Sequence, residues 1–157
     1  MSPILPSDPP WLRVAYGELG VREVKGLDDN PRILEYLRST KIRPLLIDDE
    51  TPWCGAFVGW CLEQCGIRGT KSAAARSYES YGVELLEPKD GCIAVLSRGP
   101  KPYHGHVGFY VGSDGKTGVN VAGGAHVLLL GGNQLDAVSM RLYLKSRVLT
   151  YRWPEVP

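Results

Sequence analysis

The sequence predicts an α+β protein whose helices precede its strands. Before residue 67, apolar residues recur at helical spacing in three stretches, and from Asp90 onward short apolar runs alternate with glycine and proline. The connections between those runs are short, which favours antiparallel pairing. We therefore expect helices packed on a mostly antiparallel sheet of about five or six strands.

Size and composition fit one globular domain over residues 1–157, beginning with a proline-rich segment at residues 1–10. Eighteen basic and seventeen acidic residues give a net charge of +1, and no basic patch indicates nucleic-acid binding. The N-terminus lacks the basic and apolar regions of a signal peptide, and no run has the length of a membrane span. We expect synthesis in the cytoplasm and no integral membrane association.

The first helix is expected over residues 11–19. The second begins at Asn30, a capping residue, with Pro31 in the first helical position. Between these helices, Glu23 and Asp28 are interpreted as solvated loop charges, although both suit a substrate groove.

The third helix, residues 51–66, carries the first candidate for chemistry. Thr51 is suited to the N-cap and Gly66 to the left-handed stop, which places Cys54 in the first turn. A helix N-terminus lowers a thiol pKa, so Cys54 is a candidate nucleophile. The preceding carboxylates, residues 48–50, oppose this effect if they face the thiol, and we expect them to face solvent or substrate.

The other cysteines are interpreted as small apolar residues. Cys61 and Cys65 continue the apolar face of the third helix, and Cys92 begins a buried strand. Without a signal peptide we expect free thiols. The spacing contains no Cys-x-x-Cys pair and fits zinc poorly, so we expect no metal site.

The second half of the chain predicts the sheet. A small-residue helix is expected over residues 70–78. Strands are then expected at residues 91–96, 107–112, 127–130, 138–144 and 148–153, with a further short strand at 119–122.

His106 is the candidate base, at the entrance of the strand that continues through Val107. His104 and His126 are rivals. Pro102 and Gly105 argue against His104 lying in the same strand, and His126 lacks the Gly-His-Val-Gly setting.

Asn133 follows the apolar strand that ends in two glycines, and its side-chain carbonyl is suited to orienting a histidine ring. The alternative is ordinary turn chemistry, because Gly-Gly-Asn is a good turn sequence.

Three motifs together resemble the CHAP (cysteine, histidine-dependent amidohydrolase/peptidase) and NlpC-type peptidoglycan hydrolases, and more closely a phage and prophage subgroup. The likeness runs from roughly Trp11 to Trp153. It is carried by Trp53-Cys54-x-x-Phe57-Val58-x-Trp60-Cys61-Leu62, Gly105-His106-Val107-Gly108-Phe109-Tyr110-Val111-Gly112 and Leu130-Gly131-Gly132-Asn133-Gln134.

The resemblance implies a papain-like fold with Cys54 as nucleophile, His106 as general base and Asn133 as orienting group. The implied substrate is peptidoglycan, cut at an amide or peptide bond by an endopeptidase or amidase that is monomeric and needs no cofactor. The sequence departs from papain-type enzymes six residues before the nucleophile, where Asp48 replaces a glutamine. A carboxylate does not donate unless protonated, so the second oxyanion donor is unassigned.

Reaching a cell wall then requires delivery by a holin, a phage tail or a secretion machine, with an immunity protein as a further expected partner in the last case. Two alternatives stay open: a non-catalytic phage or wall-binding protein that retains the fold, and a papain-like enzyme for another amide substrate.

The stretch Thr117–Gly124 is longer than the family requires. It is interpreted as a surface insertion, with a groove-shaping role as the alternative.

Overall fold

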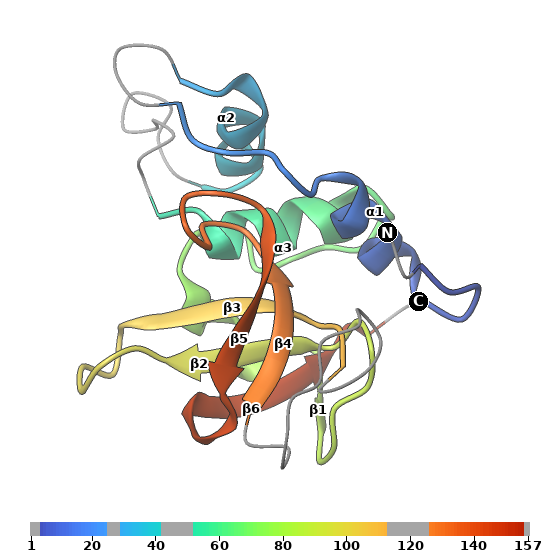
Figure 1. The fold of residues 1–157 in the computed structure, drawn as a ribbon, viewed down its shortest axis with the longest axis vertical. Helices are drawn as coiled ribbons and strands as arrows, with labels where there is room; N and C mark the ends of the chain where they lie inside the picture. Colours follow the sequence, from blue (N-terminus) through green and yellow to red (C-terminus); the bar gives the residue numbers. More distant parts are fainter. Residues whose placement is uncertain (1–3, 25–28, 42–51, 113–125, 156–157) are drawn as a thin grey trace.

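The structure, a computed structural model, describes residues 4–24, 29–41, 52–112 and 126–155. Within these ranges the chain forms a six-stranded antiparallel sheet in the order β1-β6-β2-β3-β4-β5. The α-helices lie over one face of the sheet (Figure 1). The expected α+β class with an antiparallel sheet is confirmed.

The elements follow in the predicted order of helices first and strands afterwards. The helices are α1 (Pro10–Gly17), α2 (Pro31–Arg38) and α3 (Cys54–Glu63), with the 3-10 helices η2 (Ala75–Ser80) and η4 (Lys145–Arg147). The strands are β1 (Val83–Leu85), β2 (Ile93–Ser97), β3 (Gly105–Tyr110), β4 (His126–Gly131), β5 (Ser139–Leu144) and β6 (Val148–Trp153).

Helix α3 is the centre of the helical layer. Its residues from Cys54 to Leu62 are all buried, because it packs against β3 and β4 of the sheet and against α1 and α2 (Figure 1). Gly55 lets the following chain cross closely over the helix start, since a Cβ there would lie 2.5 Å from the backbone oxygen of Ala73. The N-terminal end of α3 is therefore covered on one side by backbone.

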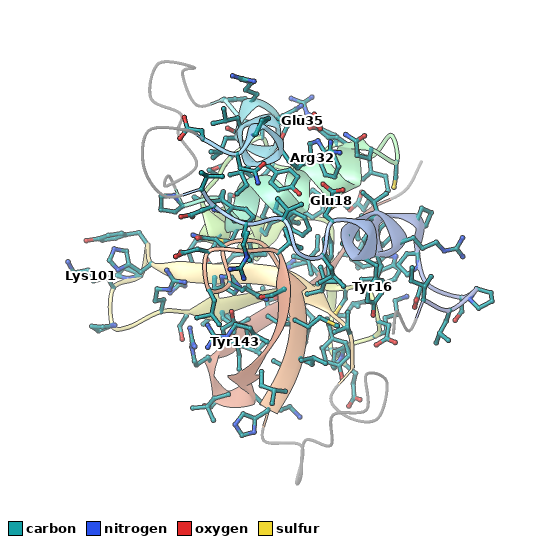
Figure 2. The ribbon with its side chains drawn as sticks, turned by 45° about the horizontal axis from the view of Figure 1, so that its top comes forward. Tyr16, Glu18, Arg32, Glu35, Lys101 and Tyr143 are labelled. Carbon is teal, nitrogen blue, oxygen red and sulfur yellow. The ribbon has the colours of Figure 1, made fainter. Side chains whose placement is uncertain are left out.

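Charged side chains tie α1 and α2 to α3 (Figure 2). Arg32 lies between the carboxylates of Glu18, at 3.1 Å, and Glu35, at 2.9 Å. Glu18 also accepts a hydrogen bond from the Tyr36 hydroxyl at 2.7 Å, and Glu35 accepts one from the Trp60 indole at 2.9 Å. The capping of α2 by the Asn30 side chain, which accepts from the Arg32 amide, agrees with the prediction.

The sheet is buried on both faces over its central strands. Alternate residues such as Val95 and Val107 pack with the helices, whereas Leu96 and Leu129 belong to a second apolar cluster that strand alternation places on the opposite face. His106 lies opposite Leu96 in the β2–β3 register and shares its face. This register explains why a histidine at the start of a strand is 1 % exposed.

Two local predictions need correction. The helix expected over residues 70–78 is a 3-10 helix, η2, that begins only at Ala75. The hydroxyls of Thr70 and Ser72 accept hydrogen bonds from backbone amides two residues on, which competes with helix formation. Strand β1 was not predicted, because Val83–Leu85 is only three residues long and is too short for its alternation to indicate a strand.

The strand expected at 119–122, the stretch 117–124, the acidic run 48–50 and Asp28 lie outside the described residues. Among the residues that are described, no helix combines the length and apolar character needed to cross a bilayer.

Candidate active site

Cys54 is the first residue of α3 and is 6 % exposed, so its predicted place in the first turn is confirmed. Thr51, the expected cap, lies outside the described residues, and the N-cap position belongs to Trp53 without a side-chain cap. Burial raises the pKa of the Cys54 thiol, and the backbone amide of Val107, the charge of Arg98 and the amide of Gly55 act in the opposite direction. The thiol thus lies beside the residue that follows His106.

Trp53 anchors the start of α3. Its indole nitrogen donates to the Glu23 carboxylate at 2.8 Å, and its ring stacks with Tyr36 at 5.8 Å. Glu23 is therefore a structural partner rather than the solvated loop charge that we expected. Trp53 is fully buried, so its indole N–H needs an acceptor, and the Glu23 carboxylate provides it.

His106 is the second residue of β3, and its side chain is buried. Burial lowers the pKa of His106 to about 4, the hydrogen bond with Gln134 raises it, and the charges of Arg98, Arg147 and Arg141 lower it further. The imidazole is neutral at neutral pH. His104 precedes β3 and is exposed, in agreement with the preference for His106 over His104.

Gln134 fixes the tautomer of His106. The Gln134 amide nitrogen donates to the carbonyl oxygens of Ser139 at 2.7 Å and Leu129 at 3.3 Å, so its Oε1 faces the ring. This oxygen lies 2.8 Å from Nε2 of His106. Because an amide oxygen only accepts, Nε2 carries the hydrogen and Nδ1 keeps its lone pair. Nδ1 is buried and has no hydrogen-bond partner among the described residues.

Asn133 lines the cavity that Cys54 also lines, and no hydrogen bond joins its side chain to His106. It adopts a left-handed backbone conformation, φ 57°, in the turn between β4 and β5, and within the described residues it makes no side-chain hydrogen bond. The hydrogen bond that sequence analysis expected from Asn133 comes from the next residue, Gln134, which the turn directs inward to 1 % exposure. A role for Asn133 in catalysis stays a prediction.

Tyr143 on β5 is a contact of His106 that sequence reasoning missed. Its hydroxyl lies 3.2 Å from Nε2, and the two rings stack with centroids 5.1 Å apart at 29°. Since the Nε2 hydrogen already points to Gln134, the hydroxyl is a secondary acceptor. No signal within the β5 sequence indicates this contact, which arises only when β5 folds back over β4.

A cavity of about 360 Å³ opens at Cys54. Its walls come from the start of α3, the chain before and within η2, the β2–β3 connection and the β4–β5 turn. The lining residues are Pro52, Cys54, Ala73, Ala74, Ala75, Arg98, Tyr103, His104, Gly105 and Asn133.

The rival base His126 is the first residue of β4. It pairs with Leu144 of β5, and among the described residues no hydrogen bond joins it to His106. The cysteines Cys61, Cys65 and Cys92 are free thiols, as is Cys54. Burial raises the pKa of Cys92 to about 12 and that of Cys61 well above its ordinary range, and neither residue lines the cavity at Cys54.

Comparison with known families gives one match. The sequence model of the CHAP domain matches residues 47–125, which is half of the chain. The chain belongs to the CHAP domain family. No curated protein matches the sequence.

CHAP domains are cysteine-dependent hydrolases that act on amide bonds of peptidoglycan, and their papain-like α+β fold agrees with the helices and antiparallel sheet of this chain. The CHAP match includes Cys54 and His106 and ends before the β4–β5 turn. The contact between His106 and Gln134 is therefore known from the structure and not from the family match.

Proposed function

We propose that this CHAP protein is a peptidoglycan hydrolase in which Cys54 is the nucleophile and His106 the general base. The observation that carries the proposal is the tautomer of His106. Gln134 keeps the hydrogen on Nε2, which leaves the buried Nδ1 without a hydrogen-bond partner among the described residues. The Cys54 thiol contacts the backbone of Val107, the residue that follows His106. A neutral imidazole with a free ring nitrogen is the form that accepts a proton.

The resting pair is neutral in this proposal. Burial raises the pKa of Cys54 and lowers that of His106, so both shifts oppose a thiolate–imidazolium pair. His106 therefore takes the thiol proton as sulfur attacks the carbonyl carbon. The same proton then passes to the leaving amine, which gives a thioester and a free amine.

Hydrolysis of the thioester follows the same route in reverse. His106 takes a proton from water, the hydroxide oxygen attacks the acyl carbon, and the thiol leaves with that proton. The backbone N–H of Cys54 at the start of α3 is the first oxyanion donor in this proposal. Asn133 lines the cavity, and we assign its side-chain amide to substrate contact rather than to orienting His106.

The bond is an amide within the stem peptide or between the stem and the sugar, which makes the protein an endopeptidase or an N-acetylmuramoyl-L-alanine amidase. A phage lytic enzyme or an antibacterial effector is the proposed setting, with delivery by a holin, a phage tail or a secretion machine. A monomer suffices for this chemistry, because the proposed groups all come from one chain.

Digestion of purified peptidoglycan by the wild type, Cys54→Ala and Cys65→Ala tests the proposal. Cys65 is a half-buried thiol near the other end of α3 and serves as the matched control. We expect soluble fragments from the wild type and Cys65→Ala only, and their masses distinguish an endopeptidase from an amidase. Release by Cys54→Ala would overturn Cys54 as the nucleophile. Release by none of the three from walls of several stem types would overturn the hydrolase function and favour a binding role.

A further inference from the structure

Three arginines surround His106 from three separate elements. Arg98 follows β2, Arg141 lies on β5, and Arg147 belongs to η4. The sheet order brings Arg147 to Arg98, because β6 pairs with β2 and starts directly after η4. Arg147 donates from Nε to the backbone oxygen of Ser97 at 3.0 Å, which fixes this arginine beside the Arg98 backbone.

Arg98 lies at the cavity, whereas Arg141 and Arg147 lie near the ring of Tyr143. Arg98 lines the cavity that Cys54 also lines. The guanidinium carbon of Arg147 lies 5.3 Å from the centre of the Tyr143 ring, and that of Arg141 lies 6.0 Å from it. The Tyr143 ring in turn stacks on His106 (Tyr143 in Figure 2). Three positive charges thus act on His106 in a molecule whose net charge is only +1.

These arginines differ from others in the described part of the chain. Arg32, Arg76 and Arg152 each form an ion pair with a glutamate. Arg98, Arg141 and Arg147 form no ion pair with any carboxylate in the described ranges. Like charges held near one another without counter-charges favour binding of an anion.

We propose that Arg98, supported by Arg141 and Arg147, binds a free carboxylate of the substrate beside the scissile amide. This inference rests on the proposed hydrolase function and adds its substrate class: stem peptides that carry an ionised carboxylate there, in preference to peptides amidated at that position. The planar guanidinium suits a carboxylate because it donates two parallel hydrogen bonds.

The same pairing assists the chemistry. The three arginine charges disfavour the imidazolium that forms when His106 accepts the thiol proton. A carboxylate bound at Arg98 offsets part of that charge. The preferred substrate is therefore expected to have a higher kcat as well as a lower KM.

Synthetic stem peptides test the substrate preference. One peptide carries both an internal and a C-terminal carboxylate, a second is amidated only at the internal position, and a third is amidated only at the C-terminus. We expect about a tenfold loss of kcat/KM for whichever amidation removes the recognised carboxylate. In Arg98→Gln this preference should fall to within about twofold, and Arg98→Lys should keep part of it.

Arg68→Gln is the matched control, because Arg68 is exposed and lies beyond the opposite end of α3 from Cys54. It should keep the wild-type preference. Equal cleavage of all three peptides by the wild type overturns the carboxylate subsite while leaving the hydrolase function intact. Cleavage of no peptide and no wall sample overturns the proposed function itself.

A second measurement needs no substrate. Iodoacetate and iodoacetamide both alkylate a thiolate with loss of iodide, but only iodoacetate is an anion. Peptide mapping should show a higher iodoacetate-to-iodoacetamide rate ratio at Cys54 than at Cys65, and Arg98→Gln should lower that ratio about threefold or more. Arg68→Gln should leave it unchanged. A ratio at Cys54 that does not respond to Arg98→Gln overturns the anion site.

Discussion

Gln134 accepts a hydrogen bond from Nε2 of His106 at 2.8 Å while its own amide nitrogen donates to the backbone oxygen of Ser139 at 2.7 Å. The β4–β5 turn thus holds the amide in one orientation, and the amide holds the imidazole in one tautomer. Nδ1 is left as the basic nitrogen.

We expect Gln134→Leu to lower kcat/KM by about 10- to 1,000-fold, because the His106 ring loses the acceptor that sets its tautomer.

Asn133→Leu should act on substrate binding instead, with a change mainly in KM. Tyr143→Phe should cost less than about threefold, since its hydroxyl is a secondary acceptor. Steady-state kinetics on a defined peptide, with thermal unfolding to verify folding, measures all three. A larger loss in Asn133→Leu than in Gln134→Leu would return the orienting role to Asn133.

The pH profile of kcat/KM should show an acid limb well below the ordinary histidine range. Burial lowers the pKa of His106 to about 4, so the base form persists down to that pH. Gln134→Glu should move the limb upward, because a carboxylate stabilises the imidazolium. An acid limb near pH 6.5 in the wild type would contradict the lowered pKa of His106.

Acid should destabilise the fold through His106. Its pKa is about 4 when folded and about 6.5 when unfolded, so the unfolded chain binds more protons between these values and stability falls as pH drops through that window. The loss by pH 4.5 is of order 2 kcal/mol, or several degrees in Tm. His106→Asn should lose less Tm between pH 7.5 and 4.5 than the wild type does.

His104→Gln is the control for this measurement, because His104 is exposed. It should follow the wild-type curve. Identical acid sensitivity in His106→Asn and the wild type would contradict the assigned role of His106 in acid stability.

Gly132→Ala should disturb the start of α3. A Cβ at Gly132 would lie 2.6 Å from Cζ3 of Trp53 and 2.8 Å from Cβ of Phe57, so the helix start must move. We expect a loss of about 1–3 kcal/mol in unfolding free energy together with reduced activity, because Cys54 follows Trp53 directly. Denaturant unfolding and peptide kinetics measure the two effects.

Gly17→Ala is the matched control at the end of α1, where a Cβ meets nothing within 4 Å. It should be neutral or slightly stabilising. Equal behaviour of the two alanine variants would show that the contact between Gly132 and Trp53 does not hold the helix start in place.

Sequence patterns predicted the large features of the fold and the local positions of Cys54 and His106. Helical spacing and Gly66 predicted the third helix, and strand alternation separated His106 from His104. Both inferences are local, because a residue's place in a turn of helix or on a strand face depends on its neighbours. The start of η2 was missed where hydroxyl groups compete with the helix for backbone donors.

The partners of His106 were beyond the reach of sequence patterns. Choosing between Asn133 and Gln134 requires the direction of the chain after a turn with positive φ at Asn133, Leu135 and Asp136, and one residue decides which amide points inward. Tyr143 reaches the ring only through the pairing of β5 with β4.

The sequence by itself determined the order of helices and strands, the position of Cys54 in the first turn of a buried helix, and the placement of His106 at the start of a strand, because short-range spacing encodes all three. Only the tertiary structure decided that Gln134 sets the tautomer, that Glu23 anchors Trp53, and that the charges of three arginines act on His106. These contacts join residues distant in sequence, and they depend on sheet order and register, which no local pattern specifies.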